Sequence, residues 1–457
     1  MFRLTLSILA AIGLSGCAEP PQQRPVPVFA SQSSSRLQVS ADRSEQSVEV
    51  VLGNAPEPNG LLTLEEALRL TLMNNPELTA FSLETRAAHA RELQAGLWPN
   101  PELSVEVEEF GGTGDRRGFD AAATTLQISQ PIELGHQSQK RKKVASFEKD
   151  LAHLDYQYKH LDIFSDAAKA FFEVLKAQEK LALSNELLDL SKVTFNSVEK
   201  RVAAGKDSPL EKTRASVAHT DIQIQHDETR RTLDFARKQL ASFWGQDAPQ
   251  FTQAAGQFDR LEPVPELGPL LDHVKQNPRY ARWQTEIRKS QAALELETAR
   301  TKGNITLGGG LQRFNDTDDN AVIFSVSIPL PISDRNQGAR QEAVFNLAKS
   351  REEQKAAWLQ LQNEFNGAYR DFTNSYRRAM SLKQDVLPGA VELFHAATRA
   401  YQEGKVDYLN VLDAQRTLFD VKNEYIESLA AYHAARTDIE RFIGTRIDTV
   451  NGPESEK

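Results

Sequence analysis

The chain has a single cysteine among its 457 residues, so it can form no internal disulfide bond. Aromatic residues make up only 8% of the sequence, and the mean hydropathy is −0.49. Long amphipathic helices have this profile more often than compact enzyme cores do. The net charge of −9 also argues against general affinity for nucleic acid, which requires a basic surface.

Several signatures of chemistry are missing as well. The sequence contains no glycine-rich phosphate loop, no G-x-S-x-G segment and no catalytic cysteine pattern. His153 and His160, like His219 and His226, are seven positions apart, which places each pair about 10 Å apart on a helix, too far to share a zinc ion. We interpret these histidines as solvated. We therefore expect no enzymatic activity, no cofactor and no metal site.

Beyond the N-terminus, no apolar run approaches the ~20 residues of a membrane-spanning helix. The N-terminus itself has a short charged start and an apolar stretch over Leu4–Leu14, which predicts a secretory signal peptide over residues 1–16. Leu14-Ser15-Gly16 and Cys17 resemble a bacterial lipobox, which implies cleavage before Cys17 and its lipidation, with palmitate, in the outer membrane. The alternative is a cleaved signal peptide followed by an incidental cysteine.

Two stretches of the chain repeat each other. Gly205-Lys206-Asp207 matches Gly404-Lys405-Val406-Asp407, and Phe243-Trp244-Gly245 matches Phe442-Ile443-Gly444. Both matches are separated by roughly 200 residues, which indicates a tandem duplication of a whole substructure rather than a solenoid.

The duplication divides the chain into successive parts. We predict an extended, Pro/Ser/Gln-rich tether over 17–60, which is lipid-anchored if Cys17 is acylated. A first structural repeat over 61–250 and a second over 251–445 follow, each with helices and two strands. Residues 446–457 form a C-terminal tail.

Helical patterns dominate both repeats, and two of the predicted helices are very long. A helix over 135–203 and a helix over 337–402 are each followed by a return helix, and at 1.5 Å per residue each long helix extends for about 100 Å. Pro388-Gly389 predicts a kink in the second. The full set of predicted helices is 64–74, 77–97, 135–203, 209–244, 279–302, 337–402 and 407–443.

Each repeat also contains two segments in which apolar and polar residues alternate, the period of a strand. They cover 103–108 and 125–129 in the first repeat, and 305–312 and 322–328 in the second. Each has room for about ten residues, near the length that crosses a bilayer. Two ordinary hairpins on a soluble core are the alternative, but little else in the chain is apolar enough to cover a sheet.

Four strands are too few for a membrane barrel, since the smallest need about eight. Lipid does not tolerate an open sheet edge. If these strands lie in a membrane, several copies of the chain must share one barrel.

From about residue 61 to 445 the sequence resembles the TolC-like outer-membrane factors of tripartite efflux systems. The duplicated helix–strand–strand–helix plan carries the resemblance, and the segment from Gly404 to Ala414 is similar to the periplasmic hairpin tip of that family. The segments Trp98–Leu103, Glu109–Gly112 and Gln130–Gly135 resemble the cobalt–zinc–cadmium branch.

The resemblance implies a mainly α protein with a membrane β-barrel portion. Three chains would form a homotrimer with a shared twelve-stranded barrel and a periplasmic tunnel of long helical hairpins, in contact with outer-membrane lipid. Glu106 and Glu108 would then face the barrel lumen. A periplasmic adaptor and an inner-membrane RND pump would dock at the tips, which carry Gly205, Lys206, Gly404 and Lys405.

The resemblance also points to a periplasmic entrance on the last long helix. Two aspartates narrow this entrance in related proteins. Asp413 matches the second of them, whereas Asn410 occupies the position of the first. Without the resemblance, Asp413 is interpreted as an ordinary helix residue exposed to solvent.

Three functions remain open at this stage. The first is a passive exit duct for divalent heavy-metal cations. The second is an outer-membrane duct for drugs or other organic compounds, which the same plan serves. The third is a structural coiled-coil periplasmic lipoprotein without a pore, although such a spacer has no use for four amphipathic strands.

Overall fold

The computed structural model describes residues 57–450. The predicted signal peptide over 1–16, Cys17 and the tether up to residue 56 lie outside the described residues, as does the tail from 451 to 457. None of the helices in the described part of the chain is both long and apolar enough to cross a membrane.

The first half of the described chain begins with two short helices. Thr63 and Glu66 form the capping box that starts α1, and the Asn75 side chain caps α2 by accepting from the Leu78 amide at 3.0 Å. The elements that follow agree closely with the predicted ranges, because caps, prolines and glycines mark their ends. They are α1 (Leu64–Asn74), α2 (Pro76–Ala95), β2 (Glu102–Glu108), β3 (Ala123–Glu133), α3 (Gln137–Ala203) and α4 (Pro209–Ser242).

The second half has the same order of helices and strands, with one interruption. Its elements are α5 (Leu267–Val274), α6 (Pro278–Arg300), β5 (Asn304–Phe314), β6 (Asn320–Ser327), α7 (Gln337–Ser381), α8 (Leu387–Gln402), α9 (Tyr408–Ile443) and α10 (Ile447–Val450). The kink predicted at Pro388 is a π-helical turn over Leu382–Val386, just ahead of the proline. Proline lacks an amide hydrogen, and the turn accommodates that gap with a wider hydrogen bond from the Leu387 amide to the Leu382 carbonyl.

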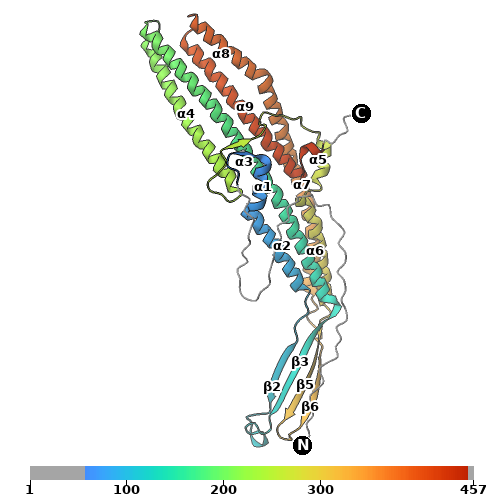
Figure 1. Ribbon diagram of the computed structural model, residues 1–457. Helices are drawn as coiled ribbons and strands as arrows, with labels where there is room; N and C mark the ends of the chain where they lie inside the picture. The colour runs from blue at the N-terminus through green and yellow to red at the C-terminus, as the bar shows by residue number, and fades with distance from the viewer. Residues whose placement is uncertain (1–56, 451–457) are drawn as a thin grey trace. The chain divides into compact units, whose positions relative to one another are not determined.

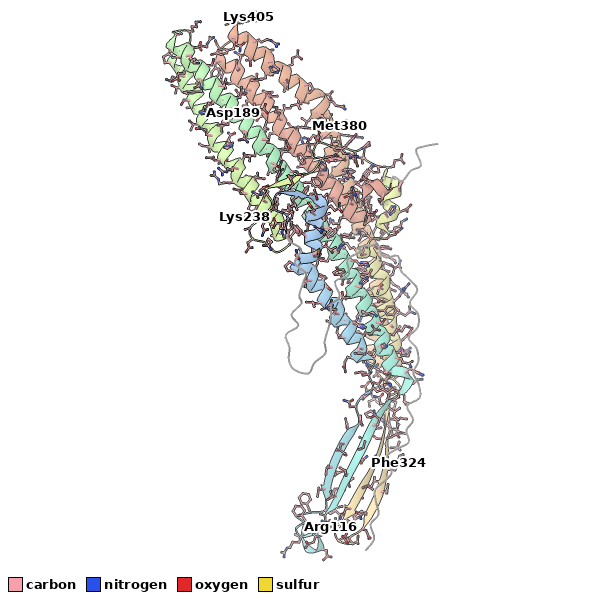
Figure 2. The ribbon with its side chains drawn as sticks, in the orientation of Figure 1. Arg116, Asp189, Lys238, Phe324, Met380 and Lys405 are labelled. Carbon is pink, nitrogen blue, oxygen red and sulfur yellow. The ribbon has the colours of Figure 1, made fainter. Side chains whose placement is uncertain are left out.

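The helices form two antiparallel hairpins: α3 pairs with α4, and α7 with its continuation α8 pairs with α9 (Figure 1). The longest helix, α3, also packs against α9 of the second hairpin. Nearer the strands, α3 packs against α2 and α6; nearer the hairpin ends, it packs against α4 and α9. Lys405, at the end of the second hairpin, and Phe324, on β6, lie at opposite ends of the helices (Figure 2).

The four predicted strands form one antiparallel sheet in the order β2-β3-β5-β6. Within the described chain, the outer edges of β2 and β6 have no partner strand. The register pairs Val105 with Leu126, Leu126 with Leu311, and Leu311 with Val322, so apolar residues of all four strands share one face. This face is exposed and includes Leu103, Val105, Leu126, Ile128, Leu311, Val322, Phe324 and Val326.

A second, smaller sheet was not anticipated from the sequence. β1 (Leu61–Thr63) and β4 (Gln253–Ala255) pair in parallel beside the middle of α3. Glu57, in the range predicted as tether, is buried here. Its carboxylate accepts hydrogen bonds from Trp244 Nε1 at 3.1 Å and from the amides of Gln250 at 2.7 Å and Phe251 at 2.9 Å. The folded body therefore begins before the first predicted helix.

Candidate functional site

The two hairpins end in matching turns, in which the glycines predicted as tip residues have a structural role. Gly205 has φ +70° and Gly404 has φ +73°, a conformation that favours glycine. The next amides, of Lys206 and Lys405, each donate back to a helix carbonyl at 2.9 Å. Each turn therefore ends its helix sharply and leaves an exposed lysine at the tip.

A polar contact joins the two tips. The Asp207 carboxylate, in the first tip, accepts from Arg201 Nε at 2.8 Å and Nη2 at 3.0 Å, and from the Tyr401 hydroxyl at 2.9 Å. Arg201 also lies over the Tyr401 ring, 4.5 Å from its centre. The hydrogen bonds from Arg201 lower the pKa of Asp207, and burial together with the bond to Asp207 raises the pKa of Tyr401 to about 12. Asp207 is thus held ionised and Tyr401 protonated.

An apolar cluster backs this contact. Val198 and Ala215 come from the first hairpin, whereas Tyr401, Tyr408 and Val411 come from the second. The two hairpins therefore share a small core at their ends, and the position of one tip depends on the other.

Sequence analysis missed Arg201 and Tyr401 as members of this site. The repeated Gly-Lys turns contain an aspartate in each copy, and this aspartate was the one sequence feature that pointed to a polar contact at the tips. The two copies differ in structure: Asp207 is engaged, whereas Asp407 is exposed at the start of α9 and makes no side-chain cap. The sequence alone does not distinguish them.

Asn410 and Asp413 lie on one exposed face of α9, in its first turns. They are three positions apart and so are neighbours on the helix surface. In the part of the chain that the structure describes, the Asp413 carboxylate forms no ion pair. Both side chains are available to whatever faces this surface of the helix.

Glu106 and Glu108 lie on the face of the sheet opposite the apolar one, because side chains alternate along β2. On the same polar face, Gln127 Nε2 donates to Ser325 Oγ at 2.5 Å, across strand β5. A Cβ atom at Gly308 would lie 2.2 Å from Gln127 Nε2. Glycine at this point lets the glutamine lie flat against the sheet.

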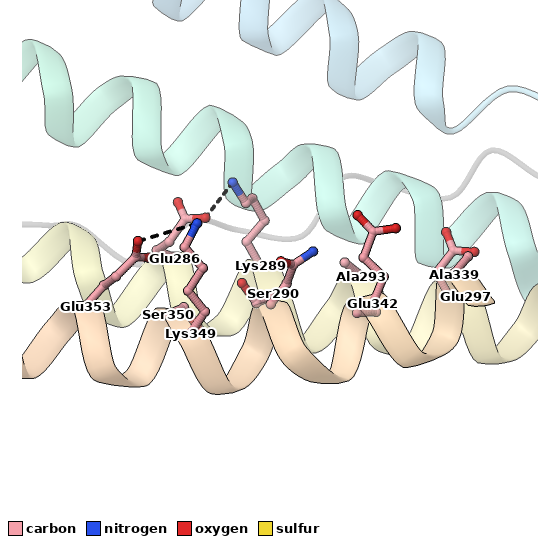
Figure 3. Close-up of a pocket in the computed structure, with 12 residues that line it drawn as sticks. Glu286, Lys289, Ser290, Ala293, Glu297, Ala339, Glu342, Lys349, Ser350 and Glu353 are labelled. Carbon is pink, nitrogen blue, oxygen red and sulfur yellow. Dashed lines mark ion pairs between the residues drawn. The ribbon is translucent and has the colours of Figure 1, made fainter. Parts of the chain in front are cut away.

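A groove between α6 and α7 is lined by four glutamates and two lysines among alanine, serine and asparagine side chains (Figure 3). Lys289 pairs with Glu286 at 2.7 Å, and Lys349 lies 3.7 Å from Glu353. Over residues 57–450, no three or more His, Cys, Asp and Glu side chains are grouped so that they could hold a metal ion. The groove is a charged hollow in the helical wall.

The histidines interpreted as solvated are partly packed. The His160 ring lies 4.1 Å from that of Phe164, and burial lowers the pKa of His160. His219 Nδ1 lies 2.8 Å from Ser191 Oγ, and its ring stacks near Phe195. The interpretation was wrong for these two residues: His160 is partly buried beside Phe164 of its own helix, and α4 places His219 against α3.

Paired helical hairpins that carry an amphipathic four-stranded sheet at one end, with a joined pair of tips at the other, define a channel subunit rather than an enzyme. The chain belongs to the outer membrane efflux protein family, whose model matches residues 67–246 and 274–445.

Two relatives show the branch of the family. The cobalt-zinc-cadmium resistance protein CzcC of Cupriavidus metallidurans is 35% identical over 85% of this chain and 91% of its own length. The nickel and cobalt resistance protein CnrC of the same organism is 23% identical over 64% of this chain and 68% of its own. The sequence-based assignment to the heavy-metal branch is confirmed.

Solved structures share the fold. CusC superimposes with a TM-score of 0.69 at 18% identity, over 84% of this chain and 92% of its own. The outer membrane protein VceC of Vibrio cholerae gives 0.67 at 17% identity, over 84% and 96%. The predicted TolC-like fold of long hairpins and four strands is confirmed.

Proposed function

We propose that three copies of this chain form the outer-membrane exit duct of a tripartite RND-type efflux system for divalent heavy-metal cations of the cobalt, zinc and cadmium class. The observation that carries this proposal is the four-stranded sheet, which has one exposed apolar face and two unpartnered edges.

The sheet supports a shared barrel for a physical reason. In lipid, every backbone amide and carbonyl needs a partner, so the edges of β2 and β6 must pair. Successive strands alternate in direction, so β6 of one copy can pair antiparallel with β2 of the next. Three copies in a ring close twelve strands, with the apolar face toward lipid and Glu106 and Glu108 toward the lumen.

The helices extend this ring into a periplasmic tunnel built from two repeats, 61–250 and 251–445. The tips with Gly205, Lys206, Gly404 and Lys405 contact a periplasmic adaptor, behind which the inner-membrane pump supplies the energy. Asn410 and Asp413 line the entrance. An acylated Cys17, after removal of residues 1–16, anchors in the membrane a tether that ends before the buried Glu57. The predicted tail of 446–457 starts too early, because α10 follows Thr445 and Arg446 and its Ile447 is buried against α9 residues.

The cargo follows from the resistance proteins to which the chain is similar and from the carboxylates of the lining. Glu106, Glu108 and Asp413, each repeated three times around an axis, give an acidic path that suits cations. The duct itself performs no chemistry.

Growth of a deletion strain on cobalt, zinc, cadmium, nickel, copper and a drug panel tests the cargo. We expect sensitivity to metals, restored by the gene in trans. Sensitivity to drugs alone would support an exit duct whose cargo is organic compounds and not metal cations. Purified protein should form detergent-resistant trimers that conduct in planar bilayers; helical rods without conductance would leave only the structural lipoprotein.

A further inference from the structure

A concentration of positive charge lies where the sheet meets the helices. Lys140, Arg141, Lys142 and Lys143 follow one another in a chain whose net charge is −9. They occupy the first turns of α3, which starts four positions after β3 ends. The N-terminus of a helix carries partial positive charge and favours acidic side chains, yet the first turn of α3 has none.

The second repeat places positive charge at the same junction. Arg335 precedes α7 and Arg340 lies near its start, again with no acidic residue in the first turn. Lys302 follows α6, just before β5. Figure 1 shows these ends of α3, α6 and α7 together where the strands begin.

Three carboxylates of this junction are already paired with other cations, while Asp334 accepts from the Asn336 amide at 2.8 Å. Glu133 pairs with Arg141 at 2.7 Å, Glu295 with Lys143 at 3.1 Å, and Glu297 with Arg300 at 2.6 Å. The remaining basic side chains form no ion pair in the described part of the chain, and most are exposed. We call these five residues the basic belt: Lys140, Lys142, Lys302, Arg335 and Arg340.

The belt lies where the helices join the sheet, next to the ends of β3 and β5. Trp98, between α2 and β2, is 66% exposed at the same junction. Tryptophan is enriched where a membrane meets water, because its ring is apolar and its N–H is polar. Lysine and arginine reach from such a level to lipid phosphates through their long apolar stems.

We propose that the basic belt binds the anionic headgroups of the phospholipid leaflet that surrounds the helix end of the barrel. This inference rests on the proposed function, since it requires the sheet to lie in a membrane. The negative phosphates offset the repulsion among the basic side chains and the unfavourable placement of these cations at two helix N-termini. Their binding fixes the depth of the barrel in the bilayer.

The test uses the full chain reconstituted in vesicles of phosphatidylethanolamine, with or without about a quarter phosphatidylglycerol, and measures the temperature at which the trimer dissociates. We expect phosphatidylglycerol to raise this temperature by several degrees in the wild type. The variant K140Q/K142Q/K302Q should lose most of that rise. The control K192Q/K238Q/K355Q, which removes the same charge from exposed sites on α3, α4 and α7, should keep it.

An equal rise in the belt variant and the control would overturn the proposal. If the belt variant does not assemble, the wild type is measured in 1 M salt, which screens charges beyond about 3 Å. We expect the phosphatidylglycerol-dependent rise in dissociation temperature to shrink there. A rise that does not change with salt would overturn the proposal. Conductance separates the two ideas. Conducting trimers without any effect of phosphatidylglycerol refute the belt and leave the duct, whereas no conductance in either lipid refutes both.

Discussion

The Tyr401 hydroxyl donates a hydrogen bond to the Asp207 carboxylate at 2.9 Å, and this contact connects the ends of two hairpins that lie almost half a chain apart in sequence. The contact requires the end of α3, in the first repeat, to lie beside the end of α8, in the second. The tips are therefore coupled, and a change at one residue should move both.

Replacing Tyr401 with phenylalanine should loosen the tip of the second hairpin. The variant keeps the ring in the apolar cluster but removes the donor to a charged acceptor, a bond worth about 1.5–3 kcal/mol. We expect a higher single-channel conductance in planar bilayers, because the tips narrow the entrance in the proposed duct.

Tyr408→Phe is the matched control. Tyr408 is buried in the same cluster, its ring 5.8 Å from that of Tyr401. Conductance should stay at the wild-type value in this variant. An equal increase in both variants would show that the change in conductance does not come from loss of the hydrogen bond to Asp207.

The tip contact should not respond to pH between about 5 and 8. The pKa of Asp207 is lowered from its ordinary value of 3.8, mainly by the hydrogen bonds from Arg201, so ionised Asp207 stabilises the contact above that value. The stabilisation is lost as pH falls through the lowered pKa. Tyr401, with a pKa of about 12, stays a donor throughout.

Conductance measured from pH 8 downward should therefore remain constant and rise only below about pH 4. Asp207→Asn should conduct at the higher level at every pH. A rise in the wild type near pH 6 would assign the response to a histidine instead.

Gly310 and Gly309 should differ sharply in their tolerance of alanine. A Cβ at Gly310 would lie 2.5 Å from the Leu126 carbonyl oxygen, which belongs to the backbone of the paired strand, whereas at Gly309 the nearest atom is 4.0 Å away. Overpacking of this kind costs about 1–3 kcal/mol. Gly310→Ala should lower the dissociation temperature of the trimer on detergent gels, and Gly309→Ala should leave it unchanged; similar values for both would contradict the register of β3 and β5.

Asp413 should contribute to cation preference at the entrance. Asp413→Ala removes one carboxylate per chain, three per ring in the proposed trimer, so the ratio of cation to anion permeability from reversal potentials should fall. Asn410→Asp adds a carboxylate on the same helix face and should raise that ratio. Unchanged permeability ratios in both variants would show that Asp413 is an ordinary solvated helix residue with no role in cation preference.

Much of the fold was predictable because its signals are local. Thr63 with Glu66 marks the start of α1, the Gly205 and Gly404 turns mark the hairpin ends, and alternation marks all four strands. The small sheet of β1 and β4 escaped prediction, because three-residue strands have no detectable period and gain their stability from packing against α3. The burial of Glu57 was equally invisible, since its partners lie about 190 residues further along the chain.

The sequence by itself determined the duplication, the lengths of the helices, the two tips and the amphipathic strands, since each depends on residues close together in the chain. Only the tertiary structure decided that Asp207 and not Asp407 is engaged, and that Gln127 reaches Ser325 across Gly308. It also decided that the helix ends of both repeats meet where the sheet begins (Figure 1). These relationships join residues roughly 200 positions apart. Their formation depends on the register of strands and the packing of helices, which no local pattern of residues specifies.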